Sequence, residues 1–516
     1  MAIDLNKTIR AILRIETDES GLTQEERSEW DERVLDYQEW EEQYNGEAIS
    51  AYDEKSVGPS GKRQKKWPLQ INLEGISCRL HQQALMGEVK DPARVPAPVV
   101  SRPEDPESDE SIAQAKVADS ALRRVEYENG LTAVDVECML LTQVYGGIAM
   151  RIYDSATRPS GIAVTYLKPE NVWFRWEGTD HLNPTDAWVR FTITPETAAS
   201  YGVEVDQDSE YIEHWTVDMR RITIAGHTAK HPTTKELMEG DNPYSVIPIV
   251  YIPHFRDGDF WGVSLVPGAK GMSEELNQRM ADWGDAGFLG VHGPIVGRNI
   301  SGGFPSPQWM QWGNIKLPWL NLGSSRLGAS SSAGQPELER VGMTLDASLF
   351  ANFVDRVEEF IRYQLMTAAP AYGQLEGTQR SGQTVYSLAW LMWSHVNVER
   401  IYWTLGLLRR ADIILTLAAK YGKLGISQEH IDLLKSVNWA PQVPLDRAAL
   451  TNEMTTRVGD GTVSPETAME KYGDIDNVPA EAEKIKDWKK YLADIQTPPG
   501  ESDRLGGSRQ VKKETE

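Results

Sequence analysis

The fold of this chain is decided by one stretch, Asp346–Gly422, which reads DASLFANFVDRVEEFIRYQLMTAAPAYGQLEGTQRSGQTVYSLAWLMWSHVNVERIYWTLGLLRRADIILTLAAKYG. In its first part, Asp346–Ala369, apolar residues recur at the spacing of one helix face, and these are Leu349, Phe353, Val357, Phe360, Ile361 and Leu365. Pro370 disfavours helix at the residue before it, so this helix is expected to end there. Residues 384–422 continue as one helical pattern of roughly 40 residues, about 60 Å long. The sequence therefore predicts two helices joined by the loop 370–383.

The residues before this stretch divide into a helical part and a β part. Thr23 and Glu26 have the spacing of a capping box, and apolar residues then recur at helical spacing until Gly46. Further helices are expected at about 69–86, 112–128 and 132–145. At Gly146 and Gly147 the apolar period changes from 3.6 to 2, and short runs separated by turn residues follow. A mostly antiparallel β lobe is therefore predicted at about 147–252.

The remaining segments are mainly helical. A helix is expected at 264–288, and residues 289–342 form an irregular stretch rich in Gly, Ser, Pro and Trp. Smaller helices are expected at 428–437, 446–458, 465–472 and 480–494, and the tail 497–516 is disordered by composition. The predicted fold class is α+β, mainly helical.

Composition excludes several classes of protein. A chain of 516 residues is expected to form two to four domains or lobes. Its 76 acidic and 53 basic residues give a net charge of −23, which disfavours tight binding to nucleic acid or anionic membranes. Cys78 and Cys138 are too few for a disulfide framework and fit a reducing compartment. The N-terminus does not read as a signal peptide, and charged residues interrupt every long apolar stretch, so no membrane-spanning helix is expected.

Enzyme motifs are absent from the sequence. It contains no phosphate-binding GxxxxGK[ST] loop, no HExxH, no GxSxG, no CxxC and no EF-hand loop. His227 and His231 are four residues apart, but they lie in a polar segment beside Pro232 and are not expected to hold a metal. We predict a non-enzymatic protein with no catalytic, cofactor-binding or metal site.

Tryptophan is abundant, with 17 residues, and this residue is enriched at protein interfaces. Trp390, Trp393 and Trp403 in the long helix are open to two interpretations, core packing or packing between subunits. A second group lies in the breaker-rich stretch and consists of Trp309, Trp312 and Trp319.

The order of these elements, supported by three local patterns, resembles the portal proteins of tailed bacteriophages of the long-tailed type. GGIAMRIYD followed by IAVTYLKPENVWF (Gly146–Phe174) is similar to the family's wing strands. GVSLVPGAKGMSEELNQRMADWGDA (Gly262–Ala286) is similar to the first stem helix. GDGTVSPETAMEKYGDIDNVPAEAEKIKDW (Gly459–Trp488) resembles the family's G-x-[IV]-S-x-E-T segment and the acidic helix after it.

The resemblance implies a role for each segment. Portal subunits form a ring, usually of twelve, around a DNA channel at one capsid vertex. The implied segments are a wing (1–263), a first stem helix (264–288), a clip (289–345), a second stem helix (346–369), a tunnel loop (370–383), a long wing helix (384–422), a crown (423–496) and a disordered tail (497–516). The long, Trp-rich clip departs from the family pattern.

The resemblance also implies partners and site residues. The clip, with its three tryptophans, would meet the large subunit of the terminase and then the head-tail adaptor. The tunnel loop would make weak, sequence-independent contact with passing double-stranded DNA through Gln374, Glu376, Gln379, Arg380 and Ser381. One arginine per subunit is too little for tight binding, because affinity grows with the number of neutralised phosphates. Major capsid and scaffolding proteins are further implied partners, with assembly in the host cytoplasm, location in the virion and no membrane contact.

Two alternatives remain open. A carbohydrate-active enzyme with a Trp-lined groove would need two carboxylates held across a pocket, which spacing in the sequence cannot reveal. Another structural protein of the phage head or neck is disfavoured by the length of the chain and its long helix.

Overall fold

The computed structural model describes residues 20–46, 71–87, 95–105, 108–177, 183–231, 235–258, 260–291, 295–298, 309–312, 315–322, 337–340, 347–367, 389–421, 424–440, 447–465, 467–468, 482 and 484–490. The chain divides into two compact units, Met1–Val443 and Pro444–Glu516. The first unit contains mixed helix and sheet around a large apolar core, which confirms the α+β class.

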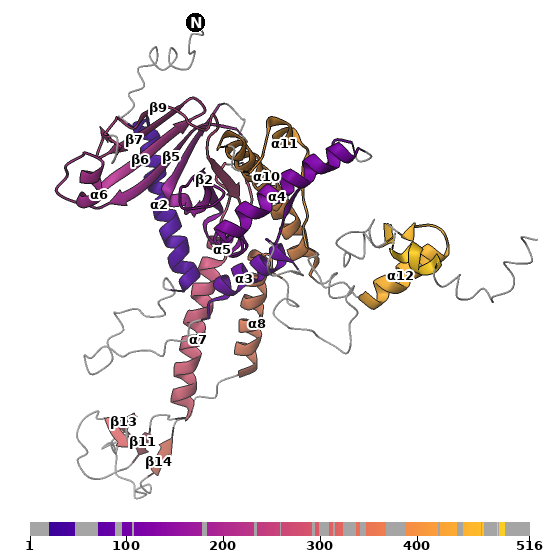
Figure 1. Ribbon diagram of the computed structural model, residues 1–516. Helices are drawn as coiled ribbons and strands as arrows, with labels where there is room; N and C mark the ends of the chain where they lie inside the picture. Colours follow the sequence, from indigo (N-terminus) through magenta and orange to yellow (C-terminus); the bar gives the residue numbers. More distant parts are fainter. Residues whose placement is uncertain are drawn as a thin grey trace, which may run out of the picture. The chain divides into compact units, whose positions relative to one another are not determined.

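The N-terminal helices lie close to their predicted positions (Figure 1). The first, α2 (Gln24–Asn45), begins with the predicted capping box, in which Thr23 accepts from the Glu26 amide and the Glu26 carboxylate accepts from the Thr23 amide. It ends at Gly46 in the left-handed conformation that glycine adopts without strain. Three more helices follow, namely α3 (Leu73–Met86), α4 (Asp109–Asn129) and α5 (Leu131–Tyr145).

The change of period at Gly146 marks the change from helix to sheet. Gly146 has φ +75°, and an added Cβ would lie 2.8 Å from the Ser264 amide nitrogen. A β-carbon at this position would therefore meet both backbone strain and a steric clash. The strand β2 (Gly147–Asp154) starts at the next residue, between β10 (Ile249–Pro253) and β3 (Ile162–Leu167) in an antiparallel sheet.

A second, larger antiparallel sheet completes the predicted β lobe. Its strand order is β4-β5-β6-β7-β8, with β9 paired to β7. The strands are β4 (Val172–Trp176), β5 (Pro184–Ile193), β6 (Ser209–Thr216), β7 (Met219–Ile224), β8 (His227–Thr228) and β9 (Glu239–Asp241), and the short helix α6 (Pro195–Ser200) follows β5.

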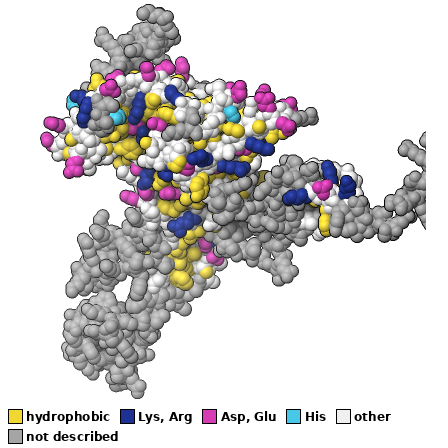
Figure 2. All heavy atoms as spheres, in the orientation of Figure 1, with side chains coloured by type: hydrophobic (Ala, Val, Ile, Leu, Met, Phe, Trp, Pro, Cys, Tyr) yellow, Lys and Arg dark blue, Asp and Glu magenta, His cyan; other side chains and the backbone are white. Residues whose placement is uncertain are grey.

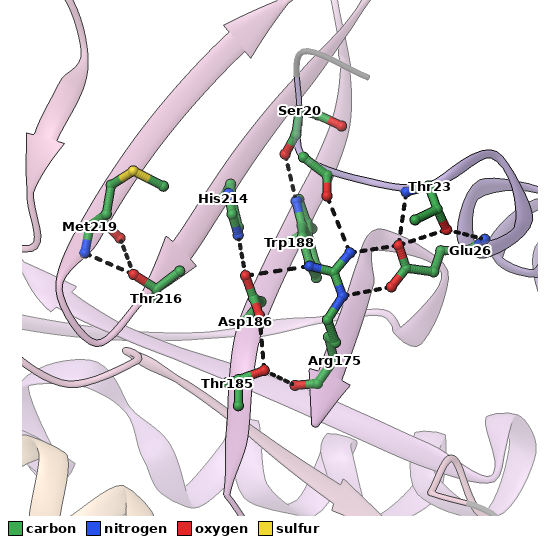
Figure 3. Close-up of polar contacts among 11 residues, drawn as sticks. Ser20, Thr23, Glu26, Arg175, Thr185, Asp186, Trp188, His214, Thr216 and Met219 are labelled. Carbon is green, nitrogen blue, oxygen red and sulfur yellow. Dashed lines mark hydrogen bonds and ion pairs between the residues drawn. The ribbon is translucent and has the colours of Figure 1, made fainter. Parts of the chain in front are cut away.

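Arg175 ties this sheet to the start of α2 (Figure 3). Its guanidinium donates to both carboxylate oxygens of Glu26, at 2.7 and 2.6 Å, and lies 3.6 Å from Asp186. On the same sheet, Trp188 donates from its indole to the Ser20 carbonyl at 2.8 Å. Arg175, which is paired with two carboxylates at a half-buried position, therefore holds the start of α2 against the sheet.

The long helix α10 (Trp390–Tyr421) packs across the first sheet and the helices α3 and α4. Gly406 allows this close approach, because a β-carbon there would collide with the side chain of Ile252 on β10. The pair Asp135 and Arg410 joins α10 to α5, with both side chains only 2% exposed.

The helices α7 (Lys270–Val291) and α8 (Ala347–Gln364) pack side by side (Figure 1). The chain between them was expected as an irregular breaker-rich stretch, but it contains a four-stranded sheet of order β12-β13-β11-β14. These strands are β11 (Ile295–Arg298), β12 (Trp309–Trp312), β13 (Ile315–Leu322) and β14 (Glu337–Arg340).

One predicted helix is wrong in its second half. Residues 428–437 were expected to be helical, but only α11 (Gln428–Asp432) is, and β15 (Lys435–Val437) pairs with β1 (Val99–Ser101). A partner strand far away in the sequence replaces the helical bonds here, so local periodicity was misleading.

The second unit contains α12 (Arg447–Gly459), close to the predicted 446–458. Among the described helices, none is long and apolar enough to cross a membrane.

Candidate functional site

The predicted tunnel-loop residues, Gln374, Glu376, Gln379, Arg380 and Ser381, lie outside the described residues. The structure describes the chain up to 367 on one side and from 389 on the other. These flanks are α8 and α10, the two helices that the sequence predicted around this loop.

The three predicted clip tryptophans lie on neighbouring strands. Trp309 and Trp312 are the first and last residues of β12, and Trp319 lies on β13. The antiparallel register places Trp309 opposite Pro318 and Trp312 opposite Ile315. All three tryptophans therefore lie on β12, an edge strand of this sheet, or on β13, the strand next to it.

The apolar face of α8 is only partly covered by the rest of the described chain. Ile361 and Leu365 are fully buried in a core shared with α3, α5 and α7. Phe353 and Phe360, seven residues apart on the adjoining strip of the helix, are 40% and 55% exposed. Figure 2 shows hydrophobic side chains along the described part of this helix pair. An exposed apolar strip of this kind is typical of a surface that contacts another chain.

The tryptophans of α10 divide between the two interpretations left open by the sequence. Trp403 is fully buried in the main core and Trp393 packs against that core. Trp390 is 60% exposed, next to the exposed Leu391. Trp403 is therefore a core residue, whereas Trp390 is available for contact with a partner.

A buried cluster of three histidines and one glutamate lies where α3, α10 and the end of β10 meet. His395 Nε2 and His254 Nε2 each lie 3.1 Å from Glu399 Oε1 and 3.2 Å from one another. His81 Nδ1 lies 3.6 Å from the same oxygen. His81, His254 and Glu399 are at most 2% exposed.

The outer atoms of this cluster are held by hydrogen bonds. His254 Nδ1 donates to the Val263 carbonyl at 2.8 Å, and His81 Nε2 donates to the Leu365 carbonyl at 3.0 Å. Gln143 donates to Glu399 Oε2 at 2.7 Å. Since carbonyl oxygens only accept, the protons on these two ring nitrogens are assigned, and the inward nitrogens face the carboxylate.

The cluster shifts the acidities of its members. Burial raises the pKa of Glu399, but the charge of His254 and hydrogen bonds from His254 and His395 outweigh burial and hold this pKa well below its ordinary value. Burial lowers the pKa of His254, but the charge of Glu399 and its hydrogen bond raise this pKa overall. For His395 burial prevails, and its pKa is lowered.

The sequence pattern did not predict this cluster. Only His395 and Glu399, four residues apart on the long helix, carry a local signal, since this spacing puts two side chains on one helix face. His81 and His254 join them through tertiary packing alone.

Residues 315–494, which are 180 of the 516, match the family model described as phage portal protein, SPP1 Gp6-like. The match runs from β13 through both helices that flank the predicted tunnel loop and into the second unit. A search of curated proteins found no match. The resemblance to portal proteins of tailed phages is confirmed by this family match.

Proposed function

We propose that this chain is one subunit of the portal ring, the conduit through which a tailed phage packages, retains and releases its DNA. The observation that carries the proposal is the portal family match over 315–494. Portal proteins are structural, so we propose no catalytic step for this chain, and ATP hydrolysis belongs to the separate terminase.

The segments keep the roles that the resemblance implies. The wing is 1–263 together with the long helix 384–422, and the stem is 264–288 and 346–369. The clip is 289–345, the tunnel loop is 370–383 and the crown is 423–496. Support comes from element order, since α7, a small sheet, α8 and α10 follow one another as this scheme requires.

Ring formation is supported by the exposed apolar strips on α8 and α10. Phe353 and Phe360 lie on the helix that we assign to the stem, where neighbouring subunits pack around the channel. Burying such side chains contributes about 1.5–3 kcal/mol each. A closed ring repeats one contact at every subunit, so even a modest contact is multiplied. We propose a ring of twelve.

The charge of the chain fits a conduit for DNA. Figure 2 shows Asp and Glu side chains around the outer face of the body that carries the sheets, and the net charge is −23. Such a surface binds DNA weakly, so that packaged DNA can slide. We assign the remaining DNA contact to the tunnel loop and docking of terminase large subunit and adaptor to the clip, within the capsid vertex.

A carbohydrate-active enzyme is the less favoured alternative. Within the described part of the chain, five tryptophans are fully buried, namely Trp30, Trp188, Trp215, Trp261 and Trp403, so these five serve packing and line no groove. A different head or neck protein is disfavoured by the portal family match.

The test is assembly of Phe360→Glu, with Ala351→Glu as the matched control. Both replacements add one charge to an exposed position of α8, but Ala351 lies on the opposite side of the helix. Native mass spectrometry and negative-stain images should show rings for wild type and Ala351→Glu, and subunits or open fragments for Phe360→Glu with unchanged helical content. A wild-type chain that remains a monomer at micromolar concentration contradicts the proposal.

A further inference from the structure

The cluster of His81, His254, His395 and Glu399 has the geometry and ligand set of a metal centre. We propose that it binds one divalent transition-metal ion of the zinc type. This site goes beyond the portal function and does not depend on it.

The distances match those between the ligands of a tetrahedral ion. Three ligand atoms, His254 Nε2, His395 Nε2 and Glu399 Oε1, are 3.1, 3.1 and 3.2 Å apart. Ligands about 2.0–2.1 Å from zinc lie about 3.3–3.4 Å apart at the corners of a tetrahedron. His81 Nδ1 lies 3.6 Å from Glu399 Oε1 and would be the fourth ligand, and His81, His395 and Glu399 offer ligand atoms within 4.8 Å of one another.

The outer hydrogen bonds orient the ligands as they do in metal sites. Val263 and Leu365 accept the outward protons of His254 and His81, so in the neutral, metal-binding form of each ring the inward nitrogen carries the lone pair. Gln143 holds the second oxygen of Glu399 and so turns Oε1 towards the histidines. His81 Nδ1 is buried and makes no hydrogen bond within the protein, so its lone pair is available to bind a metal ion.

The inward ligand atoms of three of these side chains converge on one point. His254 Nε2 and His395 Nε2 face one another at 3.2 Å, and both face the same carboxylate oxygen. With protons alone, one of the two facing nitrogens carries a hydrogen and the other a lone pair. A divalent cation accepts all these lone pairs at once and compensates the buried negative charge of Glu399.

The position of the site indicates its purpose. His81 comes from α3, His254 follows β10, and His395 and Glu399 lie on α10, while Leu365, whose carbonyl accepts from His81, directly follows α8. A bound ion would therefore fasten α3, α10 and the first sheet together next to the end of α8.

The test uses the full-length chain purified without a histidine tag after growth with added zinc. Elemental analysis should find about one zinc per chain, and cobalt replacing zinc should give the visible absorption of a tetrahedral site. Removing zinc with a chelator should lower the melting temperature, and zinc addition should restore it. His395→Ala and His81→Gln should each lose at least tenfold in zinc affinity.

The matched control is His214→Asn, which removes another buried histidine beside a carboxylate, Asp186, at 2.8 Å. It should keep its full zinc content. The proposal is overturned if wild-type protein contains no zinc and zinc does not change its melting temperature, which would make the cluster a proton-bonded network. Zinc retained by both ligand variants also overturns it. Removing zinc from the wild-type protein with a chelator tests the proposed site even if a variant fails to fold.

Discussion

At the scale of single residues, buried charges give the clearest predictions about stability. Arg410 on α10 donates from Nη2 to Asp135 Oδ2 at 3.0 Å, and both side chains are 2% exposed. Burial lowers the pKa of Arg410, but Asp135 outweighs burial and raises it overall, so this arginine stays charged. A buried ion pair is sensitive to loss of one partner, because the other charge is then left in a medium of low polarity.

Asp135→Asn should therefore lower the free energy of unfolding by about 3–5 kcal/mol. Urea denaturation followed by circular dichroism measures this loss. The control is the double variant Asp135→Leu with Arg410→Met, which removes both charges and should be more stable than Asp135→Asn. A single variant as stable as wild type would mean that water reaches the pair.

The network around Arg175 predicts a dependence of stability on pH. Burial raises the pKa of Glu26, but the hydrogen bonds and charge of Arg175, with the Thr23 amide, lower it overall. The unfolded chain keeps a glutamate pKa of about 4.3. Because the folded pKa is lower, the stabilisation is complete above about pH 4.3 and is lost as pH falls towards the folded pKa.

Glu26→Gln should accordingly lose less stability than wild type between pH 6 and pH 3, although it starts lower. Urea midpoints at both pH values measure the difference. Glu25→Gln, at the exposed neighbour, should follow wild type. Equal pH slopes for Glu26→Gln and wild type would show that this carboxylate does not contribute.

At the scale of elements, α10 combines a buried middle with an exposed apolar start, for which we propose contact with a neighbouring subunit. Its middle is buried against the first sheet, where Gly406 permits close packing with Ile252. Its start is exposed at Trp390 and Leu391. One helix can serve both purposes because its buried and exposed residues lie on different faces and at different ends.

Trp403→Ala and Trp390→Ala should separate the two purposes. Trp403→Ala should lower the free energy of unfolding by about 3–5 kcal/mol, because it leaves a cavity in the core. Trp390→Ala should change the stability of the monomer by no more than about 0.5 kcal/mol and weaken the ring. Chemical denaturation of the monomer and analytical ultracentrifugation measure these effects. Equal loss of stability in both variants would place Trp390 in the core.

At the scale of the whole molecule, the proposed conduit depends on the segment between α8 and α10. Deleting Gly373–Gln379 should leave rings intact but reduce DNA packaging or retention, because in the proposed arrangement this loop narrows the channel and its loss would widen it. Electron microscopy of rings and measurement of packaged DNA check this. Failure to assemble would make the loop a clamp between subunits, and unchanged packaging and retention would exclude a valve in this segment.

The sequence by itself determined the local elements. These features depend on neighbours within a few residues, so a single sequence is enough to predict them. They are the capping box of Thr23 and Glu26, the left-handed glycine Gly46, the change of period at Gly146 and the amphipathic pattern of α8. The order of elements was enough to indicate a portal protein, which the family match over 315–494 supports.

Only the tertiary structure decided which distant residues meet. It paired β15 with β1, where local pattern favoured helix, and buried Trp403 while leaving Trp390 exposed. It also brought His81 and His254 to His395 and Glu399. Strand partners, burial and ligand clusters depend on contacts between residues far apart in the chain, and a periodic pattern records only which face of an element is apolar, not what covers it.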